Sequence, residues 1–157
     1  MKYVVAEEKG FEIVGPKINV SVKNNENFFK IPRFWEDVKH DESFSKLEKH
    51  VGEKGVMGVC ANFDTDKNTF DYFIAIEKPD EEVDYPGLSI PESTWVKFKG
   101  FGQLPRDLQN MVKNIPNWFN EHTEYIRNDQ PELELYHPFK DEYGNSGFEV
   151  WIGVNAA

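Results

Sequence analysis

Two pairs of an acidic and an aromatic residue stand near the C-terminus, and in each pair one residue separates the two. Glu134 and Tyr136 belong to the segment PELELYHP, and Glu149 and Trp151 belong to FEVWIGV. Both segments alternate between apolar and polar residues, which is typical of β-strands with one buried face. The alternation predicts that all four side chains share the open face of a sheet, opposite its helix-covered face. A carboxylate among aromatic rings favours a cation, because the rings and the negative charge attract it together.

The alternative is that Glu134 and Glu149 are merely solvated, as polar residues are on any sheet with one open face. Two features favour a binding site. Tyr136 and Trp151 occupy positions where Lys, Thr or Ser would be expected, and the face carries few basic residues to neutralise the acids. Trp35 follows Phe34 directly, so the two cannot both lie at the centre of one helical stripe. Trp35 therefore either borders a groove or joins the core.

Other chemistry finds little support in the sequence. The histidines His40, His50, His122 and His137 lack the spacing of metal ligands, and Cys60 is the only cysteine. No serine-nucleophile, zinc-protease, P-loop or dinucleotide-binding motif is present. We therefore expect neither a metal nor a cofactor.

Length and charge limit which classes of protein remain. The 157 residues fit one domain spanning 1–157, and 15% of them are aromatic. A net charge of −10 disfavours direct contact with nucleic acid or an anionic membrane. The N-terminus carries acids where a signal peptide would be apolar, and no apolar run approaches the roughly 18 residues that cross a bilayer. The sequence thus predicts a cytoplasmic protein.

The first half of the chain predicts a strand, a helix and a hairpin. Residues 11–20 are β-branched and interrupted by Gly15 and Pro16, which indicates a strand with a bulge or a strand at the edge of a sheet. Apolar residues at helical spacing predict one long or broken helix over 31–51, with Pro32 in its first turn. Two apolar runs at 55–64 and 69–79, joined by the polar loop DTDKNT, predict a β-hairpin.

The second half repeats this order after an acidic, proline-containing segment, 77–93, which we expect to be an exposed connection. A strand at 93–102 and a helix at 105–122 precede the two alternating strands. The inward residues expected on that helix are Leu108, Met111, Val112, Ile115 and Phe119. Pseudo-repeats of about 1–80 and 92–157 predict an α+β fold. It would be a tandem strand-helix-strand-strand repeat, with an antiparallel sheet, two helices on one face and a central ligand cleft on the other.

These segments together resemble the GyrI-like small-molecule-binding domains, which are the effector-binding domains of AraC-type and MerR-type regulators. The resemblance rests on FEIVG, IPRFWEDV, the GV…FDYFIAIE hairpin, STWVKFKGFG, PELELYHP and FEVWIGV, in this order over nearly the whole chain. It implies a cleft for amphipathic, often cationic compounds. No helix-turn-helix precedes the first strand, which implies a stand-alone member without direct DNA binding.

The resemblance also implies roles for single residues. Glu134 matches an acid at the cleft floor, Glu149 a second acid near the site, and Tyr72 a tyrosine on the hairpin. Trp35 matches an aromatic residue that borders the cleft. Ala75 stands where the family usually has glycine.

Three functions follow, in order of preference. The first is binding of an amphipathic small molecule, for sequestration or for sensing on behalf of a protein partner, by a monomer or weak dimer. The second is hydrolysis of cyclopropane-containing alkylators, which some similar stand-alone members carry out. Glu134 would activate water, and Tyr72 would donate a hydrogen bond to the developing oxyanion. The third is inhibition of DNA gyrase through the acidic surface.

Overall fold

Contacts within the computed structural model, which describes residues 1–157, divide the chain into two units. One unit comprises 11–90, and the other comprises 1–10 together with 91–157. The first ten residues thus fall with the second expected repeat, whereas the sequence placed them in the first. Both units combine antiparallel strands with helices, so the predicted α+β class is confirmed.

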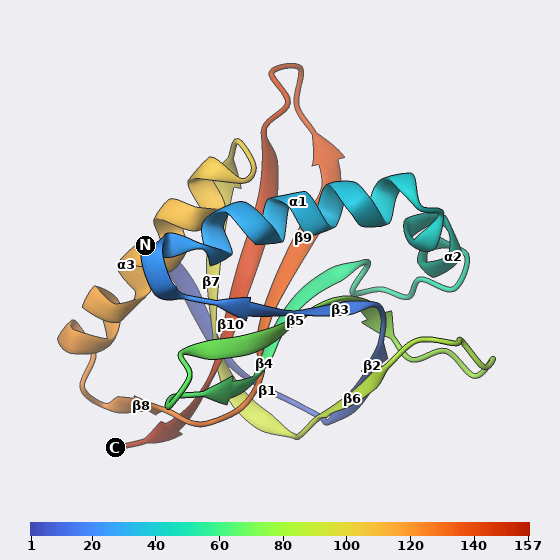
Figure 1. Ribbon diagram of the computed structural model, residues 1–157. Helices are drawn as coiled ribbons and strands as arrows, with labels where there is room; N and C mark the ends of the chain where they lie inside the picture. Colours follow the sequence, from blue (N-terminus) through green and yellow to red (C-terminus); the bar gives the residue numbers. More distant parts are fainter. The chain divides into compact units, whose positions relative to one another are not determined.

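The unit 11–90 is built around one long central strand. Its elements are β2 (Phe11–Val14), β3 (Lys17–Ser21), the 3-10 turn η1 (Lys23–Asn25), α1 (Asn27–His40), α2 (Ser43–Glu48), β4 (Met57–Asp64), β5 (Thr69–Glu77) and β6 (Gly87–Ile90). Strand β5 pairs antiparallel with β4 and also with β2 and β3, which follow each other along its other edge (Figure 1). The predicted hairpin is confirmed as β4 and β5.

The core of this unit forms where α1 and α2 cover the sheet. Val38 of α1 and Leu47 of α2 are buried with alternate residues of β5 and residues of β2 and β3, namely Val14, Val20, Phe70, Tyr72, Ile74 and Ile76. Alternate residues of a strand point to one face, so β5 presents this series to the helices. The tyrosine of the predicted site is thereby part of a packed core.

The helix predicted as long or broken is broken, because Glu42 adopts a left-handed φ of 71° between α1 and α2. Two expectations for this unit need correction. The helix begins earlier than predicted, at Asn27, so that Pro32 lies inside α1 and past its first turn. The segment expected to be an exposed connection contains β6, which pairs with β2.

The other unit carries the predicted acid and aromatic pairs. Its elements are β1 (Lys2–Glu8), β7 (Ser93–Gly102), α3 (Arg106–Glu121), β8 (Tyr125–Arg127), β9 (Glu132–Lys140) and β10 (Ser146–Ala156). Strand β7 lies between β1 and β10, and β10 also pairs with β9 and β8. The sequence did not predict β1 or β8. The last two predicted strands are confirmed as β9 and β10.

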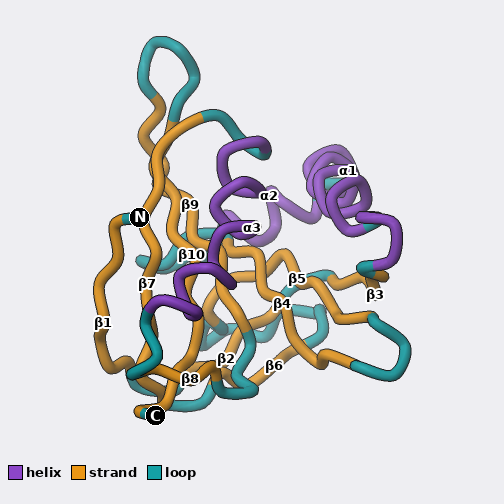
Figure 2. The backbone as a smooth tube through the Cα atoms, turned by 90° about the vertical axis from the view of Figure 1, so that its left-hand side faces the viewer, coloured by secondary structure: helices purple, strands orange, loops and turns teal.

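Helix α3 covers one face of this sheet and lies against β7 (Figure 2). Its buried residues are Leu108, Met111, Ile115 and Trp118, which pack with Phe98 of β7 and with Phe148, Val150, Ile152 and Val154 of β10. Val112 and Phe119, expected to point inward, are only partly buried, and Trp118 was not predicted. None of the helices offers an apolar stretch long enough to span a membrane.

Candidate functional site

Glu134 and Tyr136 lie two residues apart on β9 and are joined by a hydrogen bond. The Tyr136 hydroxyl donates to Glu134 Oε1 at 2.9 Å, and both side chains are half-buried. In the antiparallel register Tyr136 stands opposite Phe148, and Glu134 stands opposite Val150. Residues directly opposite each other share a face of the sheet. Glu134 therefore lies on the face that packs against α3, and it is held by an aromatic hydroxyl.

Glu149 and Trp151 lie on the other face, so the predicted common face for the two pairs is wrong. Glu149 stands opposite Leu135, and Trp151 stands opposite Leu133. Both leucines are buried, but neither belongs to the core beneath α3. The sequence prediction took their apolar character as a sign that they point toward the helices. A shift of one residue in this assignment exchanges every side chain of the strand between faces.

Glu149 is held by two donors from its own unit. His137 Nε2 lies 2.8 Å from one carboxylate oxygen, and Trp151 Nε1 donates to the other at 3.1 Å. Burial opposes ionisation of this carboxyl, but the hydrogen bonds from His137 and Trp151, together with the charge of Lys99, outweigh it and lower the pKa of Glu149. Glu149 is thus an ionised group whose two oxygens are already engaged.

The ring of Trp151 already has a cation against it. Lys97 Nζ lies 3.9 Å from the ring centroid, and the same ammonium forms an ion pair with Glu8 of β1. The Lys97 side chain is largely buried, with 13% of it exposed. Lys97 thus already makes the cation–π contact with the Trp151 ring that the sequence predicted for a ligand. The Glu149–Trp151 pair therefore forms an internal network.

Trp35 and Tyr72 form the corresponding pair in the unit 11–90. Trp35 Nε1 donates to the Tyr72 hydroxyl at 2.9 Å. Tyr72 on β5 is fully buried, whereas Trp35 on α1 is half-buried and packs against the core of its unit. Lys39 lies 5.9 Å from the Trp35 ring centroid. The sequence left open whether Trp35 borders a groove or joins the core. In the structure Trp35 packs against the core of its unit, and part of its indole stays accessible.

Glu132 stands two residues before Glu134 on β9 and was not among the residues predicted for the site. Burial raises the pKa of Glu132 above its ordinary value, Arg127 acts against this shift, and the nearby charge of Glu134 adds to it. Arg127 Nη2 donates to Glu132 Oε1 at 3.2 Å. The spacing of two residues between Glu132 and Glu134 could have pointed to Glu132 in the sequence, because it brings both carboxylates to one face of β9.

The raised pKa predicts how stability depends on pH. A carboxyl whose pKa is higher in the folded state stabilises the fold while it is protonated, and this contribution is lost as pH rises above its ordinary pKa of about 4.5. We expect Glu132→Gln to gain stability relative to the wild type as pH rises from 4 to 7, measured by denaturant unfolding. The exposed Glu142 supplies the control Glu142→Gln. A constant difference between Glu132→Gln and wild type across this range would contradict the prediction.

Two surface pockets lie elsewhere. One, of about 560 Å³, is in the unit 11–90 and has Glu12, Asp80, Glu81 and Glu82 on its walls. The other, of about 340 Å³, lies near the ends of β7, β8 and β10. Neither of these two pockets is lined by any residue of the sequence-predicted site. No three His, Cys, Asp or Glu side chains are grouped so that they could hold a metal ion.

Comparison with solved structures shows the same fold in other proteins. SAV2435, solved bound to tetraphenylphosphonium, aligns with a TM-score of 0.85 at 19% identity, over 99% of this chain and 94% of its own. An integron cassette protein from the mobile metagenome of Vibrio cholerae aligns with a TM-score of 0.72 at 18% identity, over 98% and 95%. The C-terminal domain of EcmrR aligns with a TM-score of 0.59 at 15% identity, over 99% and 98%. A search of curated proteins gave no match.

The family is shown by the sequence itself. The profile of the Cass2 family, described as integron-associated effector binding protein, matches residues 5–154. This match covers nearly the whole chain, so the predicted resemblance to the GyrI-like effector-binding domains is confirmed. The chain belongs to the Cass2 family of integron-associated effector-binding proteins.

Proposed function

We propose that this protein binds amphipathic organic cations and that Glu134 supplies the opposite charge. The observation that carries the proposal is the half-buried Glu134 carboxylate, which accepts the Tyr136 hydroxyl at 2.9 Å. A carboxylate that is partly removed from water attracts a cation more strongly than an exposed one, because the local dielectric screens it less. The relative SAV2435 was solved with tetraphenylphosphonium, a ligand that combines a cation with aromatic groups.

Tyr136 has two effects on such a ligand. Its hydroxyl fixes one oxygen of Glu134, which reduces the entropy that the acid would lose on binding. Its ring packs beside the core residues Phe148 and Val150 of the neighbouring strand, so the acid is flanked by an apolar surface. An amphipathic cation requires both an apolar surface and a fixed negative charge. The pair meets both requirements.

Within the unit 11–90, Trp35 and Tyr72 are proposed separately as an aromatic contact for the same class of ligand. The hydrogen bond of 2.9 Å between them holds the indole in one orientation, and the indole is only half-buried. A fixed indole ring is a strong partner for an organic cation. We leave Glu149 and Trp151 out, since they lie on the other face of β10 and their oxygens and ring are engaged by His137 and Lys97.

Two alternatives from the sequence stay predictions. Hydrolysis would require Glu134 to activate water and Tyr72 to donate a hydrogen bond, and incubation with a cyclopropane alkylator followed by mass spectrometry tests it. Gyrase inhibition is tested by a supercoiling assay.

The binding proposal is tested by calorimetric titration with two ligands of similar shape. Tetraphenylphosphonium carries a positive charge, and triphenylphosphine oxide carries none. We expect the cation to bind at least about tenfold more tightly, since its attraction to Glu134 is a charge interaction that the neutral compound lacks. Equal affinities for the two compounds would refute a cation site. Absence of binding by both would refute the proposed ligand class.

A further inference from the structure

Strand β1 lies at the outer edge of the sheet in its unit (Figure 2). It pairs antiparallel with β7 over seven consecutive residue pairs, from Lys2 opposite Lys99 to Glu8 opposite Ser93, and with no other strand. The register has no bulge, and the segment contains neither proline nor glycine. Backbone N–H and C=O groups along such an edge are a template for pairing with another chain. β1 therefore offers its free edge to a further strand.

Apolar side chains lie exposed along this edge. Tyr3 and Val4 keep 40% and 47% of their surface accessible, and as neighbours on a strand they point to opposite faces of the sheet. The ring of Tyr3 packs edge-on against Trp118 of α3, with 4.9 Å between the centroids, so its position is defined by the fold. A strand added beside β1 removes apolar surface from water on both faces, which favours association.

The charges of β1 are ordered along the strand. Lys2 stands at one end, and Glu7 and Glu8 stand at the other. The residue opposite Lys2 on β7 is another cation, Lys99, and none of the ion pairs of this unit includes Lys2. Like charges directly opposite each other destabilise a sheet. A carboxylate on the free side of Lys2 would therefore stabilise this end of the edge.

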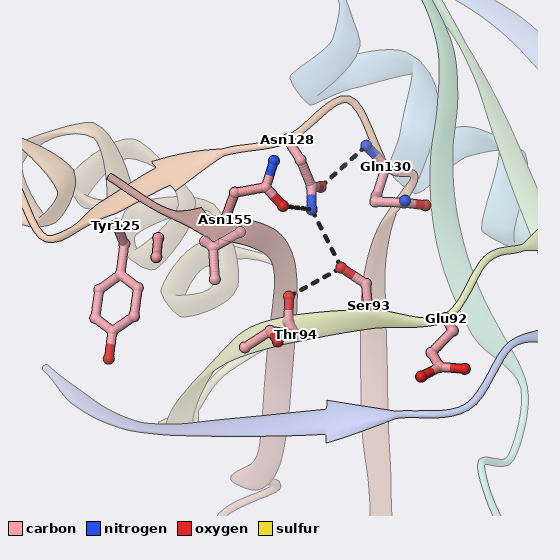
Figure 3. Close-up of a pocket in the computed structure, with 9 residues that line it drawn as sticks. Glu92, Ser93, Thr94, Tyr125, Asn128, Gln130 and Asn155 are labelled. Carbon is pink, nitrogen blue, oxygen red and sulfur yellow. Dashed lines mark hydrogen bonds between the residues drawn. The ribbon is translucent and has the colours of Figure 1, made fainter.

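Glu8 is placed so that it can accept a second cation. Lys97 Nζ bonds to Oε1 of Glu8, which leaves Oε2, and 34% of the Glu8 side chain is exposed. The end of β7 beside Glu8 is fixed, because Ser93 Oγ accepts Asn128 Nδ2 at 3.1 Å and donates to the Thr94 carbonyl at 3.0 Å (Figure 3). A group that is already held in position loses little entropy on binding.

We infer that β1 pairs antiparallel with β1 of a second copy of this chain, so that the two sheets join across a twofold axis at Val5. Such an interface makes each contact twice. With Val5 opposite its own copy, Lys2 of each chain stands opposite Glu8 of the other. Val4 then stands opposite Ala6. Residues opposite each other share a face, so each ammonium meets a carboxylate and apolar residues meet between them.

The order of charges selects this arrangement over its alternatives. A parallel pair of β1 strands would bring the acids of both copies together. The nearest antiparallel registers, two residues to either side, would place Lys2 opposite Ala6 or Glu8 opposite Val4, and both would leave the charges without partners. A slide of one residue would set side chains of opposite faces against each other. The inference does not depend on Glu134 or on the proposed ligand.

The test is sedimentation equilibrium of the full chain at protein concentrations up to the millimolar range, where we expect a reversible monomer–dimer equilibrium. Lys2→Glu sets acid against acid, and Glu8→Lys sets lysine against lysine. Each substitution should raise the dissociation constant of the dimer at least about tenfold. A mixture of the two variants restores opposite charges at both ends and should form a heterodimer about as tight as the wild-type dimer. Both variants remain acidic overall, so net charge does not draw them together.

Two controls separate this edge from other causes. Lys140→Glu, at an exposed position on β9, changes the net charge by as much as Lys2→Glu and should leave the dissociation constant unchanged. Glu8→Lys also breaks the contact with Lys97, so its fold is checked by its unfolding midpoint. Independently of any variant, alternate backbone amides of β1 in the wild type should exchange hydrogen more slowly as protein concentration rises.

Four results would each overturn the inference. They are a monomer at every concentration, a mixture that associates no more tightly than its separate variants, equal weakening by Lys140→Glu and Lys2→Glu, and exchange of the β1 amides that does not change with concentration.

Discussion

Glu134→Gln is expected to weaken tetraphenylphosphonium binding roughly 10- to 100-fold, or about 1.4 to 2.8 kcal/mol. The substitution removes the charge but retains a carbonyl oxygen that can accept the Tyr136 hydroxyl, so the side chain keeps its present position. Two unit charges about 5 Å apart attract by roughly 3 kcal/mol at the effective dielectric of a protein surface. Desolvation offsets part of this. The measurement is calorimetric titration of wild type and variant at one ionic strength.

Two comparisons isolate the role of this charge. Glu142→Gln removes an exposed carboxylate from the same unit. It should leave the affinity for tetraphenylphosphonium unchanged, because salt screens the charge of an exposed side chain. Triphenylphosphine oxide should bind wild type and Glu134→Gln equally, because it carries no charge. Trp35→Ala in the same titration tests the proposed aromatic contact. If Glu134→Gln binds the cation as tightly as wild type, Glu134 is not the counter-charge.

The sequence predicted the orientation of side chains on β9 only in part. Alternation predicted that Glu134 and Tyr136 share one face, and the structure confirms this. It could not show which face packs against α3, because Leu133 and Leu135 are also buried, away from that core. Period two assigns residues to two sets, and only the pairing with β10 shows where each set points. Glu134 therefore lies on the helix-covered face of β9, and not on the open face that the sequence predicted.

The missed strands share a physical cause. The strands β1, β6 and β8 are seven, four and three residues long. Each of them pairs with a strand that is distant in sequence. β1 illustrates this, since Lys2–Glu8 pairs with Ser93–Lys99 of β7. Strands of this kind are stabilised by backbone hydrogen bonds to a partner, which local composition does not reveal. Long apolar segments such as α3 and β5 were predicted correctly because their own periodicity determines them.

The sequence indicated an interruption of the strand at Gly15 but did not reveal its cause. The interruption predicted within 11–20 is real, since Gly15 and Pro16 separate β2 from β3. The structure adds the reason. Gly15 N–H donates to the Pro86 carbonyl at 3.0 Å, and the Pro16 carbonyl accepts the N–H of Ile74 at 3.0 Å. The backbone at this point is therefore held from both sides and lies very close to β5.

Gly15→Ala is accordingly expected to lower the free energy of unfolding by about 3 kcal/mol. A Cβ at this position would lie 1.9 Å from the Ile74 carbonyl oxygen and 2.6 Å from Ala75 Cα, and these are backbone atoms of a buried strand that no rotamer change can move. The matched control is Gly52→Ala, where a Cβ would meet nothing within 4 Å, and its effect should stay within about 0.5 kcal/mol. Denaturant unfolding measures both. Equal midpoints for Gly15→Ala and wild type would mean that β2 and β3 can move away from β5 at little cost, and the close approach would then not be a requirement of the fold.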